Sequence, residues 1–352
     1  MAQPFDAAGL ERIGEPFPVA SQASFSFSGF QVGASVAQNG TLVYLANRFD
    51  NFQLMWIDRT RRQRTNVGSP ADHRGVSLSR DGSLATALRR DEGLHLYDLA
   101  RNSEVRFSSD NASSSGVWSP DGTELAFFAT LNGVSGIYRK SANGSGKEEI
   151  LLAAQKNVRP ADWSRGSDGN EVLVFTEVDP KTNGDIWYLM NPKKPDGKPM
   201  KFLGTSAIES QGQLSPDGRW MAYTSNETGR NEVYLRQFPS GEGFARVSVN
   251  GGREPRWSKS DSELYYIEPS ERGNTVTAVS LTTDGHGGLH VGKQEQLFDF
   301  QALNFVSEMN SWLYSPHPDG QRFLVSANAE NTTPAINVIT NWRKAVAASP
   351  QH

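Results

Sequence analysis

The sequence contains no cysteine, and this absence excludes several kinds of site. A chain without thiols forms no disulfide, offers no thiolate nucleophile and holds no cysteine-ligated zinc or iron–sulfur centre. An excess of one charge is also lacking, since 35 lysines and arginines stand against 39 aspartates and glutamates, for a net charge of −4. This balance predicts neither a nucleic-acid partner nor attraction to an anionic membrane.

Long apolar runs and a secretory leader are missing as well. Nowhere do about 18 apolar residues follow one another, and the N-terminus lacks a basic start followed by about 7–15 apolar residues. We therefore expect no membrane span and no signal peptide in this sequence. Apolar residues make up 37% of the chain, which is enough for a large core. Almost no stretch has the 3.6-residue apolar period of a helix, so the sequence predicts an all-β protein.

A short motif recurs along nearly the whole sequence: an aromatic residue or leucine, then Ser, Pro or Arg, Asp and Gly. Pro with Asp-Gly favours a tight turn, and a β-rich run follows each copy. The copies lie at residues 36–40, 78–82, 118–122, 163–169, 214–218, 257–262 and 314–320. Their last residues are separated by 42, 40, 47, 49, 44 and 58 positions, which is the length of a four-stranded propeller blade.

We therefore predict a seven-bladed β-propeller of four-stranded antiparallel blades, with six or eight blades as alternatives. A single domain is expected over residues 1–352, with a tail at 343–352. The last unit provides only three strands, so the ring needs a further strand to cover its open edge. Residues 1–20 are expected to supply this closing strand from the segment 15–20, where two prolines suit an edge position. Deleting residues 1–20 should then lower the melting temperature.

The Trp-Ser-Pro-Asp-Gly units resemble the TolB-type, WD-like β-propeller repeats of bacteria. The order of several further segments is similar to that in the C-terminal propeller of acidobacterial-type serine/threonine protein kinases, namely 3–6, 14–19, 39–44, 225–234, 318–324 and 341–342. The resemblance covers essentially the whole chain. It implies a sensory or protein-binding module and a periplasmic or extracytoplasmic location. The sequence by itself leaves the location unknown.

Kinase activity is not implied by this resemblance. The sequence shows no Gly-rich phosphate loop, no His-Arg-Asp catalytic loop and no Asp-Phe-Gly motif. In the kinase-linked family the propeller usually follows a kinase domain and a membrane span. Two interpretations follow, a stand-alone relative and a fragment of a longer protein.

Polar residues at the junctions between successive units are the candidate ligand contacts, because these loops surround one mouth of a propeller channel. The candidates are His73, Arg74, Arg159, Glu209, Arg253, Glu254 and Glu308. Together they could hold a carboxylate, a sugar or a peptide terminus. The competing interpretation is structural, since such residues often tie neighbouring blades together by ion pairs and bonds to backbone.

No metal site and no cofactor are predicted. His286 and His290 are four residues apart, but the three glycines around them indicate a loop instead of one helix face. No Gly-x-Ser-x-Gly nucleophile elbow is present. The aspartates of the repeated motif are expected to cap their own turns by accepting backbone N–H bonds.

These observations predict a monomeric binding module that recognises a protein, a peptide or a small polar or anionic ligand at the channel mouth. The alternative is a hydrolase or lyase acting on a polar or anionic substrate, such as a saccharide, at the same mouth. The seven candidate residues would then be the pool for its acid, base and oxyanion-stabilising groups. An enzyme needs a base within hydrogen-bond reach of a deep pocket, whereas a binding module needs only a broad face.

Overall fold

The computed structural model describes residues 3, 5–16, 19, 25–26, 31–32, 34–46, 52–89, 92–108, 114–260, 262–271, 273–284, 288–302, 311–329 and 335–342. The chain divides into two compact units, one formed by Met1–Asn51 with Ala329–His352 and one by Phe52–Asn328. This division differs from the expectation of one domain over the whole chain, because strands from the two terminal segments pair with each other. The described residues include no helix that is long and apolar enough to cross a membrane.

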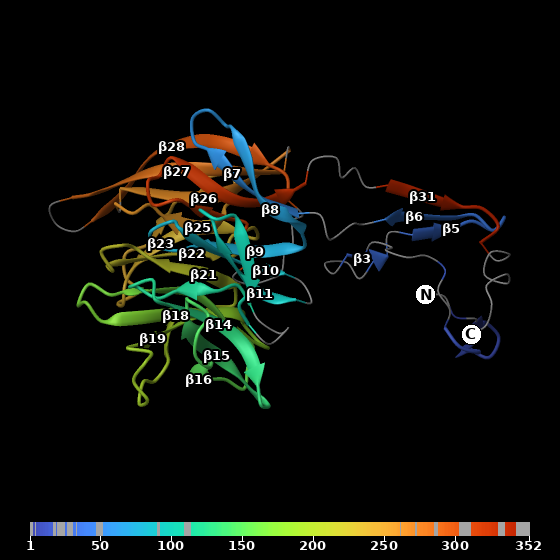
Figure 1. The fold of residues 1–352 in the computed structure, drawn as a ribbon, viewed down its shortest axis with the longest axis horizontal. Coiled ribbons are helices and arrows are strands. Elements are labelled where there is room, and N and C mark those ends of the chain that lie inside the picture. Colours follow the sequence, from blue (N-terminus) through green and yellow to red (C-terminus); the bar gives the residue numbers. More distant parts are fainter. Residues whose placement is uncertain are drawn as a thin grey trace. The chain divides into compact units, whose positions relative to one another are not determined.

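The unit Phe52–Asn328 is a β-propeller, and six four-stranded antiparallel sheets are present among its described residues (Figure 1). Five sheets take their strands consecutively from the chain. The first three consist of β9 (His73–Leu78), β10 (Leu84–Arg89), β11 (Gly93–Asp98) and β12 (Ser103–Arg106); β13 (Val117–Trp118), β14 (Glu124–Leu131), β15 (Val134–Ser141) and β16 (Glu149–Ala153); and β17 (Val158–Arg165), β18 (Glu171–Asp179), β19 (Asn183–Met190) and β20 (Met200–Leu203). The next two consist of β21 (Glu209–Leu214), β22 (Trp220–Ser225), β23 (Glu232–Gln237) and β24 (Ala245–Arg246); and β25 (Arg253–Trp257), β26 (Glu263–Ser270), β27 (Gly273–Thr283) and β28 (Leu289–Phe300).

The sixth sheet joins the two ends of the propeller unit, in the order β29-β30-β7-β8. Its strands are β29 (Tyr314–Pro316), β30 (Arg322–Asn328), β7 (Phe52–Asp58) and β8 (Arg64–Ala71). Strand β30 pairs with β7 from Arg322 opposite Asp58 to Asn328 opposite Phe52. The positions expected for the segment 15–20 are therefore occupied by residues 52–71, whose β7 has buried side chains and can donate N–H bonds on both sides. Of the segment 15–20, residues 15, 16 and 19 lie in no strand, and residues 17, 18 and 20 lie outside the described residues.

The second unit contains shorter sheets. Its strands are β1 (Phe5–Asp6), β2 (Glu11–Arg12), β3 (Phe25–Ser26), β4 (Gln31–Val32), β5 (Ala34–Val36), β6 (Leu42–Ala46) and β31 (Ala335–Ile339). Strands β31, β6 and β5 form a three-stranded sheet that includes the first copy of the repeated motif, at residues 36–40. The all-β propeller of four-stranded antiparallel blades is thus confirmed, whereas the count of seven blades is not. The expected tail at 343–352 lies outside the described residues.

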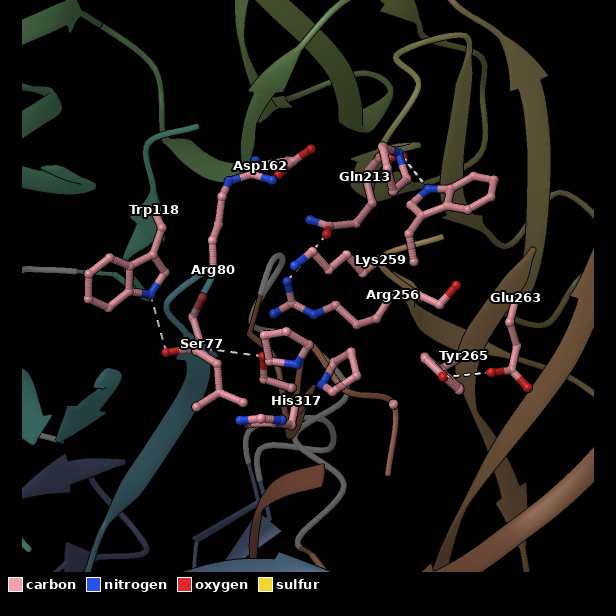
Figure 2. A pocket seen from close by; sticks show the side chains of 18 of the residues that line it. Ser77, Arg80, Trp118, Asp162, Gln213, Arg256, Lys259, Glu263, Tyr265 and His317 are labelled. Atoms are coloured by element: carbon pink, nitrogen blue, oxygen red, sulfur yellow. Dashed lines mark hydrogen bonds between the residues drawn. The ribbon is translucent and has the colours of Figure 1, made fainter. Parts of the chain in front are cut away.

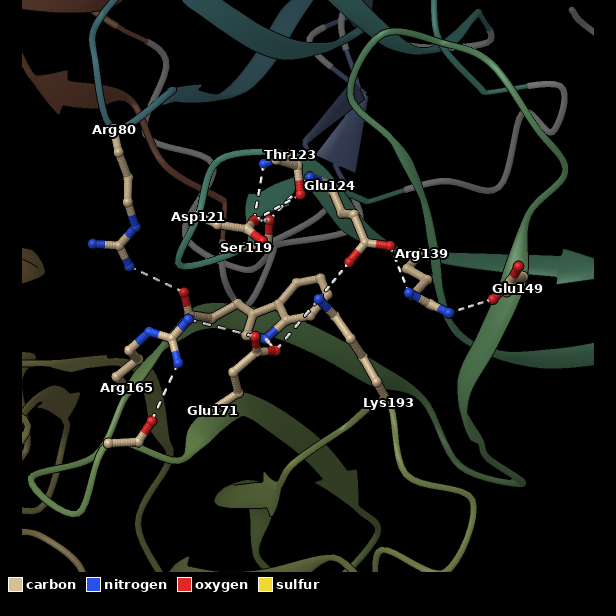
Figure 3. Close-up of polar contacts among 12 residues, drawn as sticks. Arg80, Ser119, Asp121, Thr123, Glu124, Arg139, Glu149, Arg165, Glu171 and Lys193 are labelled. Atoms are coloured by element: carbon tan, nitrogen blue, oxygen red, sulfur yellow. Dashed lines mark hydrogen bonds and ion pairs between the residues drawn. The ribbon is translucent and has the colours of Figure 1, made fainter.

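The repeated motif forms the turn between the first two strands of a blade, and its residues explain the turn (Figure 3). The hydroxyl of Ser119 donates to Asp121 Oδ1 over 2.6 Å and accepts the Glu124 N–H at 2.9 Å. Asp121 Oδ1 also accepts the Thr123 N–H at 3.0 Å, and Gly122 has φ +73°, in the region that favours glycine. The same Asp-to-backbone bond recurs at Asp81, Asp217 and Asp319, so the aspartates cap their turns as predicted.

The core lies between the facing sides of neighbouring blades. One buried cluster combines Val117 and Ile137 of one blade with Trp163, Leu173 and Phe175 of the next. Two tryptophans of the repeated motif, Trp118 and Trp257, also tie first strands together by hydrogen bonds from the indole nitrogen Nε1. These bonds run from Trp118 to the Ser77 carbonyl (3.3 Å) and from Trp257 to the Gln213 carbonyl (3.0 Å). This packing holds the first strands of the blades around a shared channel.

Candidate functional site

A cavity of about 740 Å³ lies in the channel, at the end of the first strands where the Ser-x-Asp-Gly turns lie (Figure 2). All six sheets contribute to its lining, among others through Ser77, Trp118, Asp162, Gln213, Arg256 and Ser315. Its volume falls within the range of about 300–1,000 Å³ that is usual for ligand pockets. Polar and charged side chains are present alongside two tryptophans, so the cavity suits a polar ligand.

One position of the repeat supplies the chemistry of this cavity. The residues two places before the motif serine line the cavity in five sheets, and they are Ser77, Val117, Asp162, Gln213 and Arg256. The neighbouring position, one place before the serine, holds the leucine or tryptophan that the repeat requires. Because side chains alternate along a strand, the repeat leaves the earlier position free to differ between blades. Sequence reasoning focused on the loops and missed this position, although its departure from the repeat was the available signal.

Arg256 on β25 places a guanidinium deep in the cavity. Its Nη1 donates to Gln213 Oε1 over 3.3 Å, and its Cζ lies 3.7 Å from the ring centroid of Trp312. Burial lowers the pKa of Arg256 to about 10, which leaves it protonated at neutral pH. The stacking fixes the plane of the guanidinium.

Asp162 on β17 is a carboxyl group of the same cavity. Its Oδ2 accepts the Ser164 hydroxyl at 2.7 Å and the Leu214 N–H at 3.0 Å. Burial raises the pKa of Asp162, while the positive charge of Arg80 and these hydrogen bonds oppose the rise. Arg80 donates through Nη2 to the Trp163 carbonyl (3.2 Å) and to the Ser164 hydroxyl (3.3 Å). Arg80 thus extends from the β9–β10 turn to a blade that is not its neighbour in sequence.

The other acidic side chains of the lining are engaged by neighbours. Both Glu263 oxygens accept from Arg59, at 2.6 and 2.9 Å, and Oε2 also accepts the Tyr265 hydroxyl at 2.6 Å. These bonds hold the pKa of Glu263 below its usual value against the effect of burial. Asp319 lies 2.9 Å from His317 Nδ1 and caps its own turn.

Comparison with known proteins identifies the fold. No protein family model matches the sequence. A protein assigned as TolB in Agrobacterium tumefaciens superposes with a TM-score of 0.60 at 19% identity, over 79% of this chain and 98% of that chain. The fold is a TolB-type β-propeller. TolB from Acinetobacter baumannii gives a TM-score of 0.50 at 13% identity, over 83% of this chain and 67% of that one. An uncharacterized protein of Agrobacterium fabrum is 24% identical over 260 residues, which is 58% of this chain and 81% of the relative.

The site residues predicted from the sequence lie elsewhere in this TolB-type propeller. Glu308 falls outside the described residues, and none of the six described candidates lines the cavity. His73, Arg159, Glu209 and Arg253 stand in the opening residues of their first strands, whereas the cavity is at the end of these strands. The TolB-type propeller therefore brings a different set of side chains together from the one expected.

The described candidates contact neighbouring protein groups. Arg74 Nε donates to Asp72 at 3.1 Å, and the guanidinium of Arg159 stacks on Phe128 at 4.4 Å. The buried carboxyl of Glu209 accepts the Thr205 N–H at 3.1 Å and the Thr205 hydroxyl at 2.5 Å. Of these contacts, that of Arg159 with Phe128 joins neighbouring blades, whereas those of Arg74 and Glu209 are with residues two and four positions away in the sequence.

Arg253 and Glu254 form an ion pair at the start of β25. Arg253 Nη2 also donates to Asn274 Oδ1 at 2.6 Å. Glu254 Oε2 accepts the Leu313 N–H at 2.6 Å, so this carboxyl joins two blades. Burial raises the pKa of Glu254, and the charge of Arg253 opposes the rise.

We expect His73 to make the stability of the propeller sensitive to acid. The side chain is buried, with Nε2 2.9 Å from the Tyr97 hydroxyl and Nδ1 3.2 Å from the Phe52 carbonyl. Burial lowers the pKa of His73 to about 4, so the folded state keeps the imidazole neutral where the unfolded state, with a pKa of 6.5, takes up a proton. The stabilisation present above pH 6.5 is lost as the pH falls toward 4. We expect this to lower the free energy of unfolding by up to about 3 kcal/mol.

Denaturant titrations between pH 7 and 4.5 would measure this loss. The variant His73→Gln should show a shallower fall of the free energy of unfolding with acid than the natural protein does. His290→Gln is the control, because His290 is exposed. Equal slopes for His73→Gln and the natural protein would contradict the assignment.

Proposed function

We propose that this TolB-type propeller is a binding module whose channel cavity receives a protein segment, a peptide or a small polar ligand. The observation that carries the proposal is a cavity of about 740 Å³ lined by side chains from all six blades of the described propeller. Loops and strand ends on a rigid scaffold are common places for recognition. The partner therefore enters at the end of the channel where the repeated turns lie.

The alternative function, a hydrolase or lyase, would have to draw its acid and base from the same lining. Asp162 is the carboxyl best suited to hold a proton there, because burial raises its pKa. The other described carboxyls, Glu263 and Asp319, are engaged by Arg59 and by a turn. A hydrolase or lyase would need a second group for proton transfer beside Asp162, whereas ligand binding needs none. We therefore favour ligand binding.

The absence of cysteine allows a direct test, because one introduced thiol is labelled at one place only. Ser260 lines the cavity and is exposed, so Ser260→Cys can carry a bulky maleimide at the mouth without disturbing the core. Peptides selected from a random library on the unlabelled protein should bind at least about tenfold more weakly after labelling. Fluorescence anisotropy with each selected peptide measures the change in Kd.

Ser145→Cys is the matched control. Ser145 is exposed in the turn between β15 and β16 and is absent from the cavity lining. Labelling it should leave the Kd unchanged. Selected peptides that bind equally well to both labelled proteins would show that recognition occurs outside the cavity, and a selection that enriches no peptide would argue against peptide binding.

A further inference from the structure

The cavity has an excess of positive charge, although the whole chain carries −4. Three cationic side chains of the lining, those of Arg80, Arg256 and Lys259, have no carboxylate within ion-pair distance among the described residues. Of the acidic lining residues, Glu263 is paired with Arg59 and Asp319 with His317. Because His317 carries a charge only when protonated, the carboxyls of Asp162 and Asp319 both count, and three cations remain against these two carboxyls.

Arg256 is the most constrained of these cations. Its guanidinium stacks on the buried indole of Trp312 and donates to two neutral oxygens on other strands, Gln213 Oε1 at 3.3 Å and the Val76 carbonyl at 3.5 Å. Its Nε is buried without a hydrogen-bond partner among the described residues. Removing a guanidinium from water without a matching anion is costly. An incoming anion would supply the partner that the fold does not.

Arg80 and Lys259 extend this positive region to the rim. Both are exposed, and they come from the β9–β10 and β25–β26 turns. Figure 2 shows Arg80 extending toward Asp162, and Lys259 beside Gln213 and Arg256. A ligand entering from this side meets the rim cations before it reaches Arg256, an order that suits electrostatic capture followed by a directional bond.

We propose that the cavity recognises a carboxylate group of its ligand, with Arg256 as the directional contact and Arg80 and Lys259 as the rim cations. This inference rests on the proposed binding function and names the chemical class of the ligand. A guanidinium matches a carboxylate through two parallel N–H···O bonds, and the stacked Arg256 is already held in one plane. The carboxylate could belong to a peptide terminus, an acidic side chain or a small free acid.

The test uses the full chain and three matched hexapeptide arrays. One array has free C-terminal carboxylates and no acidic side chain, one has amidated termini with a single Glu, and one has amidated termini with no acid. We expect the first or second array to bind at least about tenfold more tightly than the third. The array that binds identifies the source of the carboxylate. Binding of succinate when neither acid-containing array binds would assign the site to a small free acid.

Variants then locate the contact. Arg256→Gln should weaken binding at least about tenfold. Arg256→Lys keeps the positive charge but loses the paired N–H donors of the guanidinium, so its Kd should lie between those of Arg256→Gln and the natural protein. Arg80→Gln and Lys259→Gln should each weaken binding a few-fold, and more so at low salt. Lys198→Gln is the control, because Lys198 is exposed outside the cavity and should leave the Kd unchanged. If a melting experiment shows that Arg256→Gln does not fold, the double variant Arg80→Gln with Lys259→Gln tests the carboxylate inference instead, because both side chains are exposed.

Two negative outcomes are distinguishable. Equal binding of the acid-free amidated array, or unchanged binding in the Arg80 and Lys259 variants, would overturn the carboxylate inference and leave the binding function standing. Failure of all three arrays and of succinate to bind the natural protein would count against the proposed function itself.

Discussion

Replacing Ile57 with alanine is expected to lower the melting temperature by about 5–15 °C. Ile57 is fully buried on β7, in the sheet that joins the two ends of the propeller, and it packs in the cluster that contains Tyr265, Phe323 and Val325. Truncating a buried isoleucine leaves a cavity and costs about 2–5 kcal/mol of the free energy of unfolding. For a domain of this size each kcal/mol shifts the melting temperature by about 2–4 °C. Scanning calorimetry would measure the shift.

Ile150 provides the matched control for this prediction. It lies on the outer strand β16 with 45% of its surface exposed, so Ile150→Ala should change the melting temperature by no more than about 2 °C. Deleting residues 1–20 tests whether these residues or strands β7 and β8 close the propeller. If β7 and β8 close the propeller, this deletion leaves the main transition in place. A fall in the melting temperature as large as that caused by Ile57→Ala would assign the closing role to residues 1–20.

Replacing Trp163 with alanine is expected to cost about 3–5 kcal/mol of the free energy of unfolding. The indole is fully buried between the sheets that begin with β13 and β17, and its Nε1 donates to Glu171 Oε2 at 3.2 Å. Lys193 lies above the same ring at 5.2 Å and forms ion pairs with Glu124 (2.7 Å) and Glu171 (3.6 Å) (Figure 3). The substitution therefore removes core packing and loosens an ion-pair network that connects two blades. Denaturant titration measures the loss.

Trp163→Phe tests how this loss divides between packing and hydrogen bonding. The smaller ring keeps most of the apolar contact and loses the N–H donor, so we expect a cost of about 1–3 kcal/mol, below that of the alanine variant. Both variants keep the backbone carbonyl that accepts from Arg80. Equal costs for phenylalanine and alanine would show that the indole N–H, and not the buried ring, carries the stabilisation.

The cavity lining and the repeated turns draw on different positions of the same repeat. The motif serine and aspartate make local bonds that repeat from blade to blade, and the tryptophan or leucine before the serine serves the blade interface. The position two before the serine lines the cavity and differs between blades, with Ser77 in one blade, Asp162 in another and Arg256 in a third. Some of these side chains also bond to a neighbouring blade, as Asp162 does to the Leu214 N–H.

The sequence by itself determined the features that depend on neighbours a few residues apart. The motif predicted the tight turns and the capping by Asp121 and its counterparts, because these structures are formed by bonds such as Ser119 to Asp121 and Asp121 to Thr123. The spacing of the copies then predicted a propeller.

The tertiary structure alone decided which strands close the propeller and which side chains meet in its channel. Pairing of Val325 with Met55 joins segments about 270 residues apart in the sequence, and the spacing of the repeat does not specify which distant segment completes the sheet. The cavity lined by Asp162, Gln213 and Arg256 depends on the tertiary structure for a related reason. Each of these residues is separated from the next by one blade length, so only the curvature of the assembled ring brings their side chains into one cavity.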